Sequence, residues 1–151
     1  VDGNELLKKY GGDAVELLWK SVSRESVQWL RQQHFGFLEL DCLLIHGSSV
    51  GVNDELKADT PAWKMLDRLQ RVGANQLFCG RSGQIFEYEL RGGSVCSKVL
   101  PLDEEQSSET VELTDKRVVG VGSVGRHWGK ATYTLYDPNS NRVNFRQVNY
   151  N

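Results

Sequence analysis

The residue with the clearest chemical potential is His46, because of its place in the sequence. It follows the apolar run CLLI at 42–45 and precedes the turn-forming residues GSS at 47–49. A buried strand that carries an imidazole at its carboxyl end is a common way of placing a ligand in an α/β protein. A single histidine of this kind is more often structural than a ligand. Its role therefore depends on the partner side chains that the rest of the chain supplies.

The segment that follows His46 matches the G-x-S-x-G pattern of a hydrolase nucleophile, with GSSVG at 47–51 and Ser49 in the nucleophile position. That pattern requires a helix to begin directly after the serine. Here the chain continues as a polar loop, and the next helix start is near Pro61. A catalytic triad would also need a downstream histidine, and His127 is the remaining candidate. Both observations disfavour a serine hydrolase.

A second glycine motif, GVGSVG at 120–125, matches G-x-G-x-x-G and follows an expected strand. The dinucleotide-binding fingerprint requires a helix whose amino terminus holds the pyrophosphate. The residues that follow are RHWG at 126–129, and another strand comes next. We interpret this motif as a glycine-rich turn between two strands.

Length, charge and cysteine content limit the number of domains, the types of binding partner and the cellular compartment that we expect for this protein. We expect the 151 residues to form one domain, and the formal net charge of -2 gives no electrostatic case for nucleic-acid binding. No apolar stretch approaches the ~20 residues of a membrane helix. Three widely spaced cysteines without a C-x-x-C pair indicate a reducing compartment, so we predict a cytoplasmic location. The chain begins without Met or a signal peptide, and we expect a fragment or a processed product.

Helices and apolar strands alternate in the first part of the chain. The periodicity predicts a helix over 13–22 and a second helix capped by Ser23, then strands at 37–41 and 42–46. Thr60 and Pro61 predict a helix start, with Thr60 as the cap. Its expected buried stripe comprises Trp63, Leu66, Leu69 and Val72, with Met65 beside them. A short buried strand is predicted at 77–79.

Strands and turns follow from residue 80 onward. Strands are predicted at 85–90, 95–100 and 117–121, an acidic, solvated loop at 103–109, and a hairpin formed by 131–137 and 142–150. Helices with buried strands followed by a run of strands favour an α/β sandwich over an all-parallel sheet.

Four short segments, in this order, resemble landmarks of a known family. They are GNEL at 3–6, IHGS at 45–48, CGRSG at 79–83 and VGSVG at 121–125. Together they resemble the second half of a calcineurin-like metallophosphoesterase domain, most of all the small bacterial and archaeal phosphodiesterases. The resemblance implies a mixed α/β (α+β) fold, a metallophosphoesterase-type β-sandwich flanked by helices. Of that sandwich, residues 1–151 would form a single partial domain, the second half only.

The same resemblance implies roles for particular residues. Asn4 and His46 correspond to metal ligands, and Glu5 stands where the family has the histidine that protonates the leaving group. The divalent metal would be manganese, zinc or iron. Arg81 and Gly83 stand where the family has two metal-binding histidines. Arginine stays protonated and repels a cation, and glycine has no side chain, so the metal-binding motifs are degenerate.

Two interpretations of function follow. In the first, the protein hydrolyses phosphoesters with two metal ions held ~3.5–4 Å apart, and most of their ligands lie in a missing amino-terminal half. In the second, the chain is a degenerate pseudo-phosphoesterase without metal. It would then be an anion-binding or protein-interaction module, in which Arg81 and Arg126 bind a phosphate-containing small molecule. In either case an incomplete sandwich exposes sheet edges, so we expect association with the missing half or with a second copy.

Overall fold

The structure is a computed structural model that describes residues 4, 7–8, 11–91, 94–98, 108–112 and 115–151. Residues 1–34 and 35–151 form two compact units. In the first unit, α2 (Gly12–Ser21) and α3 (Arg24–Gln32) confirm the two expected helices. The Ser23 hydroxyl accepts a hydrogen bond from the Ser26 amide at 3.1 Å, which confirms its capping role. Within the described residues, every helix is too short or too polar to cross a bilayer.

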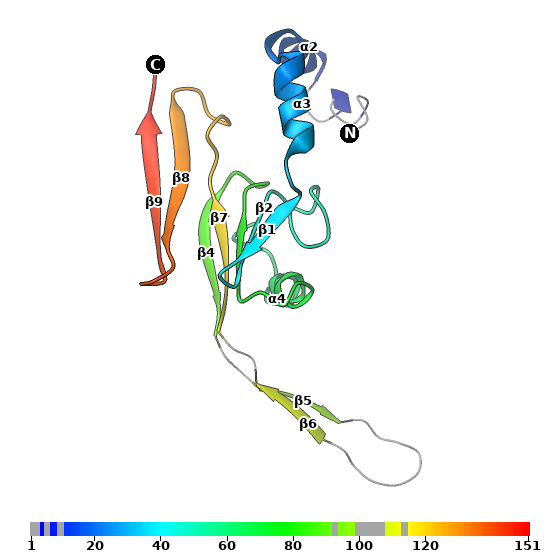
Figure 1. Cartoon of the computed structure of the whole chain (residues 1–151), viewed down its shortest axis with the longest axis vertical. Coiled ribbons are helices and arrows are strands. Elements are labelled where there is room, and N and C mark those ends of the chain that lie inside the picture. The colour runs from blue at the N-terminus through cyan, green and yellow to red at the C-terminus, as the bar shows by residue number, and fades with distance from the viewer. Residues whose placement is uncertain (1–3, 5–6, 9–10, 92–93, 99–107, 113–114) are drawn as a thin grey trace. The chain divides into compact units, whose positions relative to one another are not determined.

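The second unit is built on a five-stranded sheet with strand order β1-β2-β3-β7-β4 (Figure 1). Its strands are β1 (Gly36–Glu39), β2 (Cys42–Ile45), β3 (Gln76–Cys79), β4 (Ile85–Leu90) and β7 (Lys116–Val121). The three central strands β2, β3 and β7 are parallel, and β1 and β4 pair antiparallel at the two sides. The mixed sheet confirms the expectation that the chain is not an all-parallel protein.

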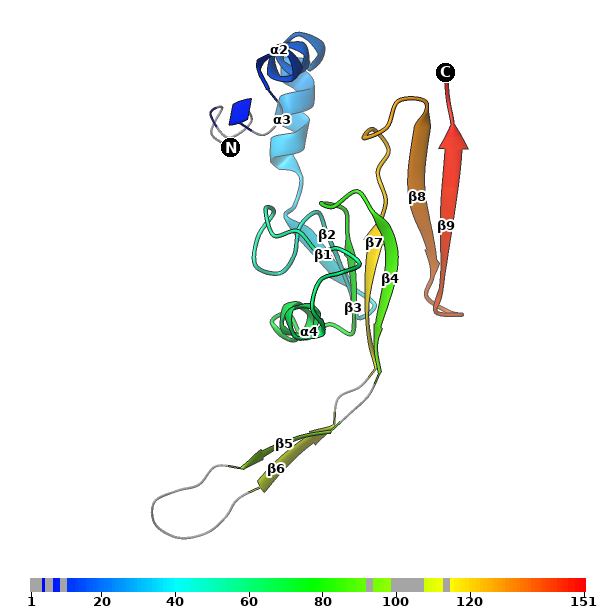
Figure 2. The same ribbon diagram turned by 180° about the vertical axis from the view of Figure 1, so that it is seen from behind.

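Each face of this sheet is covered by a different element (Figures 1 and 2). Helix α4 (Ala62–Gln70) covers one face, and the hairpin of β8 (Lys130–Asp137) and β9 (Arg142–Asn149) lies on the other. Side chains alternate between faces along a strand, so Leu77 packs in the α4 core and its neighbour Phe78 packs under the hairpin. The Phe78 and Tyr136 rings lie 5.0 Å apart between centroids.

The start and the buried stripe of α4 differ from the expectation. The amino-terminal cap is Pro61, and the Thr60 hydroxyl instead accepts a hydrogen bond from the Lys57 amide at 2.8 Å. Trp63 was expected in the core but is 70% exposed. Met65 and Leu69, one helical turn apart, are fully buried and face the sheet, which turns Trp63 away from it.

A further strand pair lies between β4 and β7 in sequence. Strands β5 (Ser94–Lys98) and β6 (Ser108–Glu112) pair antiparallel. The predicted strand at 95–100 is confirmed where it is described. The loop prediction at 103–109 is wrong at residues 108 and 109, because backbone pairing does not require apolar side chains; residues 103–107 lie outside the described part of the chain.

Two of the three cysteines are buried free thiols, Cys42 and Cys79. Burial, with a smaller contribution from the negative charge of Asp54, raises the pKa of Cys79 to about 12. Both residues behave as the small hydrophobes that their strand positions predict.

Gly120 gives a direct test of this packing. A Cβ atom at this position would lie 2.4 Å from the Phe86 ring, which shows that the ring packs directly against the β7 backbone. We expect Gly120→Ala to lower the free energy of unfolding by about 1–3 kcal/mol, because Phe86 must move. Gly125→Ala is the matched control, since no atom lies within 4 Å of its added Cβ. Urea unfolding measures both, and equal losses of stability would contradict this packing.

Candidate functional site

The carboxyl ends of the three parallel strands meet at one edge of the sheet. The register aligns Ile45 of β2 with Cys79 of β3, and Cys79 with Gly120 of β7. His46 therefore lies beside the segment after β3 and near the loop after β7. We call residues 46, 80–83 and 122–126 the carboxyl edge. It contains His46, Arg81 and Arg126, which the sequence alone had singled out.

His46 is joined to the segment after β3 through its backbone. Its carbonyl accepts hydrogen bonds from the Gly80 amide at 3.0 Å and the Arg81 amide at 2.7 Å. A Cβ on Gly80 would lie 3.7 Å from His46 Nδ1, so the imidazole lies against the Gly80 backbone. Burial, and then the positive charge of Arg81, lower the pKa of His46 below its ordinary value of 6.5. His46 is therefore neutral at pH 7 and can act as a ligand or a hydrogen-bonding group.

Arg126 reaches across the edge to the segment after β3. Its Nη1 atom donates a hydrogen bond to the Ser82 carbonyl. A Cβ on Gly83, which has φ +65, would lie 2.8 Å from the same Nη1 atom. The guanidinium of Arg126 thus occupies the space that a side chain at residue 83 would need. By resemblance, residue 83 is the position of a metal-binding histidine. In this chain the positively charged guanidinium of Arg126 occupies the space that such a histidine side chain would fill.

The loop that carries Arg126 is held by Ser123, which the sequence reasoning missed. The Ser123 hydroxyl accepts hydrogen bonds from the Gly125 amide at 3.4 Å and the Arg126 amide at 3.1 Å. Its backbone pairs with Thr132 of β8, with the Thr132 amide 2.8 Å from the Ser123 carbonyl. A serine two or three residues before its amide partners is the recognisable signal of such a turn.

The two glycine motifs have structural roles. The Ser49 hydroxyl donates to the Arg68 carbonyl at 2.7 Å, and Ser48 and Gly51 exchange two backbone hydrogen bonds, so no helix follows the serine. This contradicts a nucleophile elbow. Gly122 has φ +87 in the connection between β7 and β8, where a Cβ would lie 2.4 Å from the Thr132 hydroxyl. The interpretation of this motif as a connection between two strands is confirmed for residues 122–125, while residues 120 and 121 end β7.

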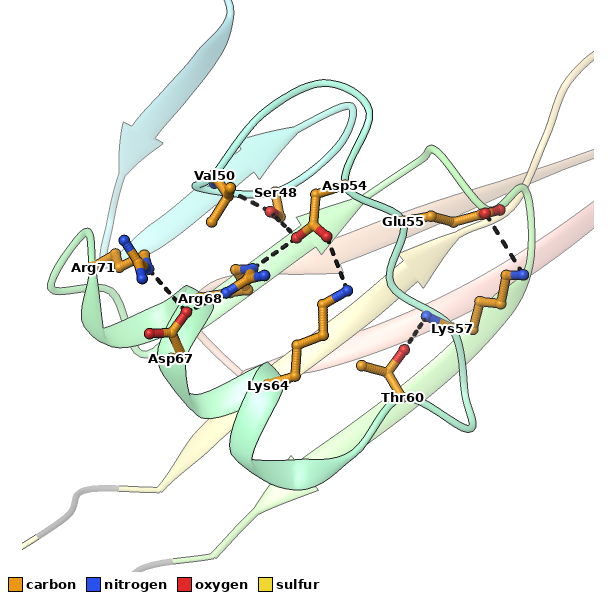
Figure 3. Close-up of polar contacts among 10 residues, drawn as sticks. All are labelled: Ser48, Val50, Asp54, Glu55, Lys57, Thr60, Lys64, Asp67, Arg68 and Arg71. Atoms are coloured by element: carbon orange, nitrogen blue, oxygen red, sulfur yellow. Dashed lines mark hydrogen bonds and ion pairs between the residues drawn. The ribbon is translucent and has the colours of Figure 1, made fainter.

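The loop after His46 is fixed to α4 by a cluster around Asp54 (Figure 3). The Asp54 carboxylate accepts hydrogen bonds from Ser48 and from Arg68 Nε at 2.7 Å, and it pairs with Lys64 Nζ at 2.9 Å. Burial alone would raise the pKa of Asp54. The hydrogen bonds from Arg68, Ser48 and Lys64 outweigh burial and hold this pKa well below its ordinary value of 3.8. The cluster therefore fixes Ser48, two residues beyond His46.

The described residues do not fit a dinuclear metal centre. Among them, no group of three or more His, Cys, Asp or Glu side chains could hold a metal ion. Asn4 lies in the amino-terminal unit, where it is exposed, and Glu5 lies outside the described residues. The roles predicted for Asn4, Glu5 and His46 at a metal stay predictions. The cations on Arg81 and Arg126 make the carboxyl edge a better match for an anion.

A polar cavity of about 530 Å³ lies at the opposite ends of the strands, away from His46. Its lining includes Asp41, Asn75 and Arg117. These groups bond to their neighbours: Asp41 accepts from the Asn75 side chain at 2.6 Å, and Arg117 Nη1 donates to Glu87 at 3.0 Å. Among the described residues, these contacts leave the buried Nε atom of Arg117 without a hydrogen-bond partner, and we assign no ligand to the cavity.

Comparison with known proteins supports a single fold assignment. No known family model matches the sequence, and no curated protein matches it. The structure is similar to that of a metallophosphoesterase from Sphaerobacter thermophilus, with a TM-score of 0.64 and 14% sequence identity, over 100% of this chain and 60% of that chain. The chain has a metallophosphoesterase-type fold.

A second solved structure agrees. It is a hypothetical protein from Pyrococcus horikoshii OT3, with a TM-score of 0.60 and 18% identity, over 91% of this chain and 49% of that chain. The expected mixed α+β fold class, part of a metallophosphoesterase-type architecture, is confirmed. The chain spans less than two thirds of either similar chain. Which half of the fold it represents stays a prediction.

Asp54→Asn tests the cluster that fixes the loop after His46. We expect the free energy of unfolding to fall by about 2–3 kcal/mol at pH 7, because the partly buried Arg68 and Lys64 lose their counter-charge. The folded-state pKa of Asp54 is lowered, so its contribution is present above the unfolded pKa and is lost as pH falls from 3.8 toward the folded pKa. Urea titrations at several pH values should show the difference from wild type shrinking below about pH 4.

Asp67→Asn is the control for this variant. The Asp67 side chain is 37% exposed and pairs with Arg71 at 2.8 Å on the helix surface. It also accepts a hydrogen bond from Arg68 Nη1, but Arg68 keeps its Asp54 partner in this variant. We expect a clearly smaller loss of stability than in Asp54→Asn, because the carboxylate is screened by solvent. A loss as large as that of Asp54→Asn would contradict the special role of the Asp54 cluster.

The pKa of His46 tests the electrostatics of the carboxyl edge. NMR titration should give a pKa below 6.5, and Arg81→Gln should raise it by removing the neighbouring positive charge. Arg142→Gln, at the far end of the β8–β9 hairpin, should leave the pKa of His46 unchanged. An unchanged pKa in Arg81→Gln would show that Arg81 does not act on the imidazole.

Proposed function

We propose that this chain is part of a phosphoester-processing protein of the metallophosphoesterase type, and that its carboxyl edge binds the phosphate group. The observation that carries the proposal is the placement of Arg126 over Gly83, on the segment that also carries Arg81, whose positive charge acts on His46. A guanidinium has five N–H donors in a planar fork that matches phosphate oxygens. One nitrogen of Arg126, Nη1, bonds the Ser82 carbonyl, which fixes the group while other N–H donors remain to face a ligand.

The reaction class proposed for the whole protein is phosphoester hydrolysis, a metal-dependent phosphodiesterase or phosphatase activity. In that case Arg81 and Arg126 would neutralise the phosphate, and neutral His46 would supply one ligand or hydrogen bond at the same edge. Asn4 is a further candidate metal ligand and Glu5 the candidate general acid, and the remaining metal ligands would come from residues beyond those described. A Glu acts as an acid near neutral pH only if its pKa is raised.

The second candidate function is binding without hydrolysis. The specific observation in its favour is that Arg126 occupies the space at Gly83 where the resemblance implies a ligand side chain. An edge that carries two arginines and a neutral histidine recognises an anion without any metal. Both candidate functions share the same phosphate-binding residues and differ in whether the phosphoester bond is cleaved.

We also propose that the protein works in association with a further segment of a longer chain or with a second copy. The support is exposed apolar side chains on both faces of β1 and its neighbour β2. Leu38 is 57% exposed on one face, and Phe37 and its partner Leu44 are 49% and 41% exposed on the other. Exposed apolar side chains on an outer strand favour association.

Phosphate binding tests what the two candidates share. In EDTA, calorimetric titration with inorganic phosphate should show binding, and Arg81→Ala should weaken it about tenfold because a charged hydrogen bond is lost. Arg142→Ala should bind phosphate as the wild type does. Unchanged affinity in Arg81→Ala, or no binding by the wild type, would refute the proposed phosphate site.

Metal analysis and an assay with bis-p-nitrophenyl phosphate, both on the full-length gene product, then separate the candidates. Bound manganese, zinc or iron, with hydrolysis that EDTA abolishes, would establish the hydrolase. Phosphate binding with neither metal nor hydrolysis would establish the binding module.

A further inference from the structure

Strand β1 is the end strand of the five-stranded sheet, and within the described part of the chain β2 is the strand it pairs with (Figure 1). An end strand presents backbone amides and carbonyls to a further strand, and proteins commonly prevent such pairing with Lys, Pro or a bulge. The sequence of β1 is GFLE, which pairs with β2 residue for residue and carries its single charge on Glu39, the last position. The edge is therefore open to pairing.

The turn between β1 and β2 decides which backbone groups face this edge. Both of its residues have positive φ, 49° and 63°, as in a type I′ hairpin turn. The residues that flank such a turn form a hydrogen-bonded pair, and such pairs alternate with non-hydrogen-bonded pairs along the strands. Glu39 and Phe37 thus bond to β2 through their backbones. Gly36 and Leu38 alternate with them, so their amides and carbonyls point to the outer edge.

A second copy of β1 matches this edge when it runs antiparallel across a two-fold axis at Phe37. Gly36 of each copy then lies opposite Leu38 of the other copy. These are the two residues whose backbone groups point outward, so each Gly36–Leu38 pair exchanges both of its backbone hydrogen bonds. The two copies of Phe37 face each other as the non-hydrogen-bonded pair between them.

The side chains match across the same axis. Phe37 and Leu44, which lie on one face and are 49% and 41% exposed, would meet the same two residues of the second copy in one row. On the other face, the 57%-exposed Leu38 would lie opposite Gly36, which has no side chain to oppose it. Glu39 lies away from the axis, so the two like charges do not meet. One short sequence supplies both sides, which favours a second copy over an unrelated strand.

We propose that two copies of this chain associate by antiparallel pairing of their β1 strands, which joins the two five-stranded sheets edge to edge. This inference rests on the proposed association and makes it specific, since it names a second copy as the partner and the β1 edge as the contact. It does not depend on the phosphate site. The contact is short, so we expect a dimer that dissociates on dilution.

Sedimentation of the 151-residue chain over a range of concentrations should show a monomer–dimer equilibrium. Leu38→Lys should weaken the dimer at least about tenfold, because charged side chains on an end strand oppose pairing. Leu135→Lys is the matched control, since it replaces a leucine of β8 that is 50% exposed. It should leave the equilibrium unchanged, and circular dichroism should show that both variants are folded.

Disulfide cross-linking tests the position of the axis. In a Cys96→Ser background the remaining thiols are the buried Cys42 and Cys79. Phe37→Cys should then form a cross-linked dimer on mild oxidation, because the Cα atoms of a non-hydrogen-bonded antiparallel pair lie about 4.5 Å apart, within the range of a disulfide. Leu38→Cys should not, because its two copies are diagonal neighbours about 7–8 Å apart.

Three results would overturn the inference. A chain that stays monomeric up to about 1 mM does not pair in this way, although association with a further segment and the phosphate site would be unaffected. A dimer that Leu135→Lys dissociates and Leu38→Lys does not is held by another surface. A dimer that cross-links through Leu38→Cys and not through Phe37→Cys is not centred on Phe37.

Discussion

The parallel pairing of β2, β3 and β7 is the constraint on which the rest of this unit depends. Because the three strands run in one direction with aligned register, the segments that follow them must emerge at the same edge. The His46 carbonyl strengthens this arrangement by accepting both the Gly80 and Arg81 amides. Side chains that are distant in sequence thereby form one neighbourhood.

That neighbourhood is electrostatically unlike a metal site. A dinuclear centre needs a cage of anionic and neutral ligands around two cations. Here Arg126 is fixed over Gly83, and the charge of Arg81 helps to keep His46 unprotonated. The fold is of the metallophosphoesterase type, while the described residues at this edge include two arginines, whose positive charges repel a metal ion.

Local sequence patterns predicted where strands and turns occur more accurately than they predicted which side chains are buried. The runs at 42–46 and 77–79, and the turn at 122–125, are found where the apolar and glycine patterns place them, because strand and turn preferences act over a few residues. The prediction that Trp63 is buried was wrong. Apolar residues lie on more than one side of this helix, and the side that packs on the sheet is the one with Met65 and Leu69. Strand β6 was missed because its sequence lacks an apolar run.

By itself the sequence determined the order of strands and helices apart from β6, the position of His46 at a strand end, the candidate roles of Arg81 and Arg126, and a resemblance that implied the fold. Only the tertiary structure decided what these residues contact. Three contacts illustrate this. Arg126 lies over Gly83, the Ser123 hydroxyl accepts a hydrogen bond from the Arg126 amide, and Ser48 donates a hydrogen bond to Asp54. Such contacts depend on strand register and on the way loops fold back, and short-range patterns do not encode either.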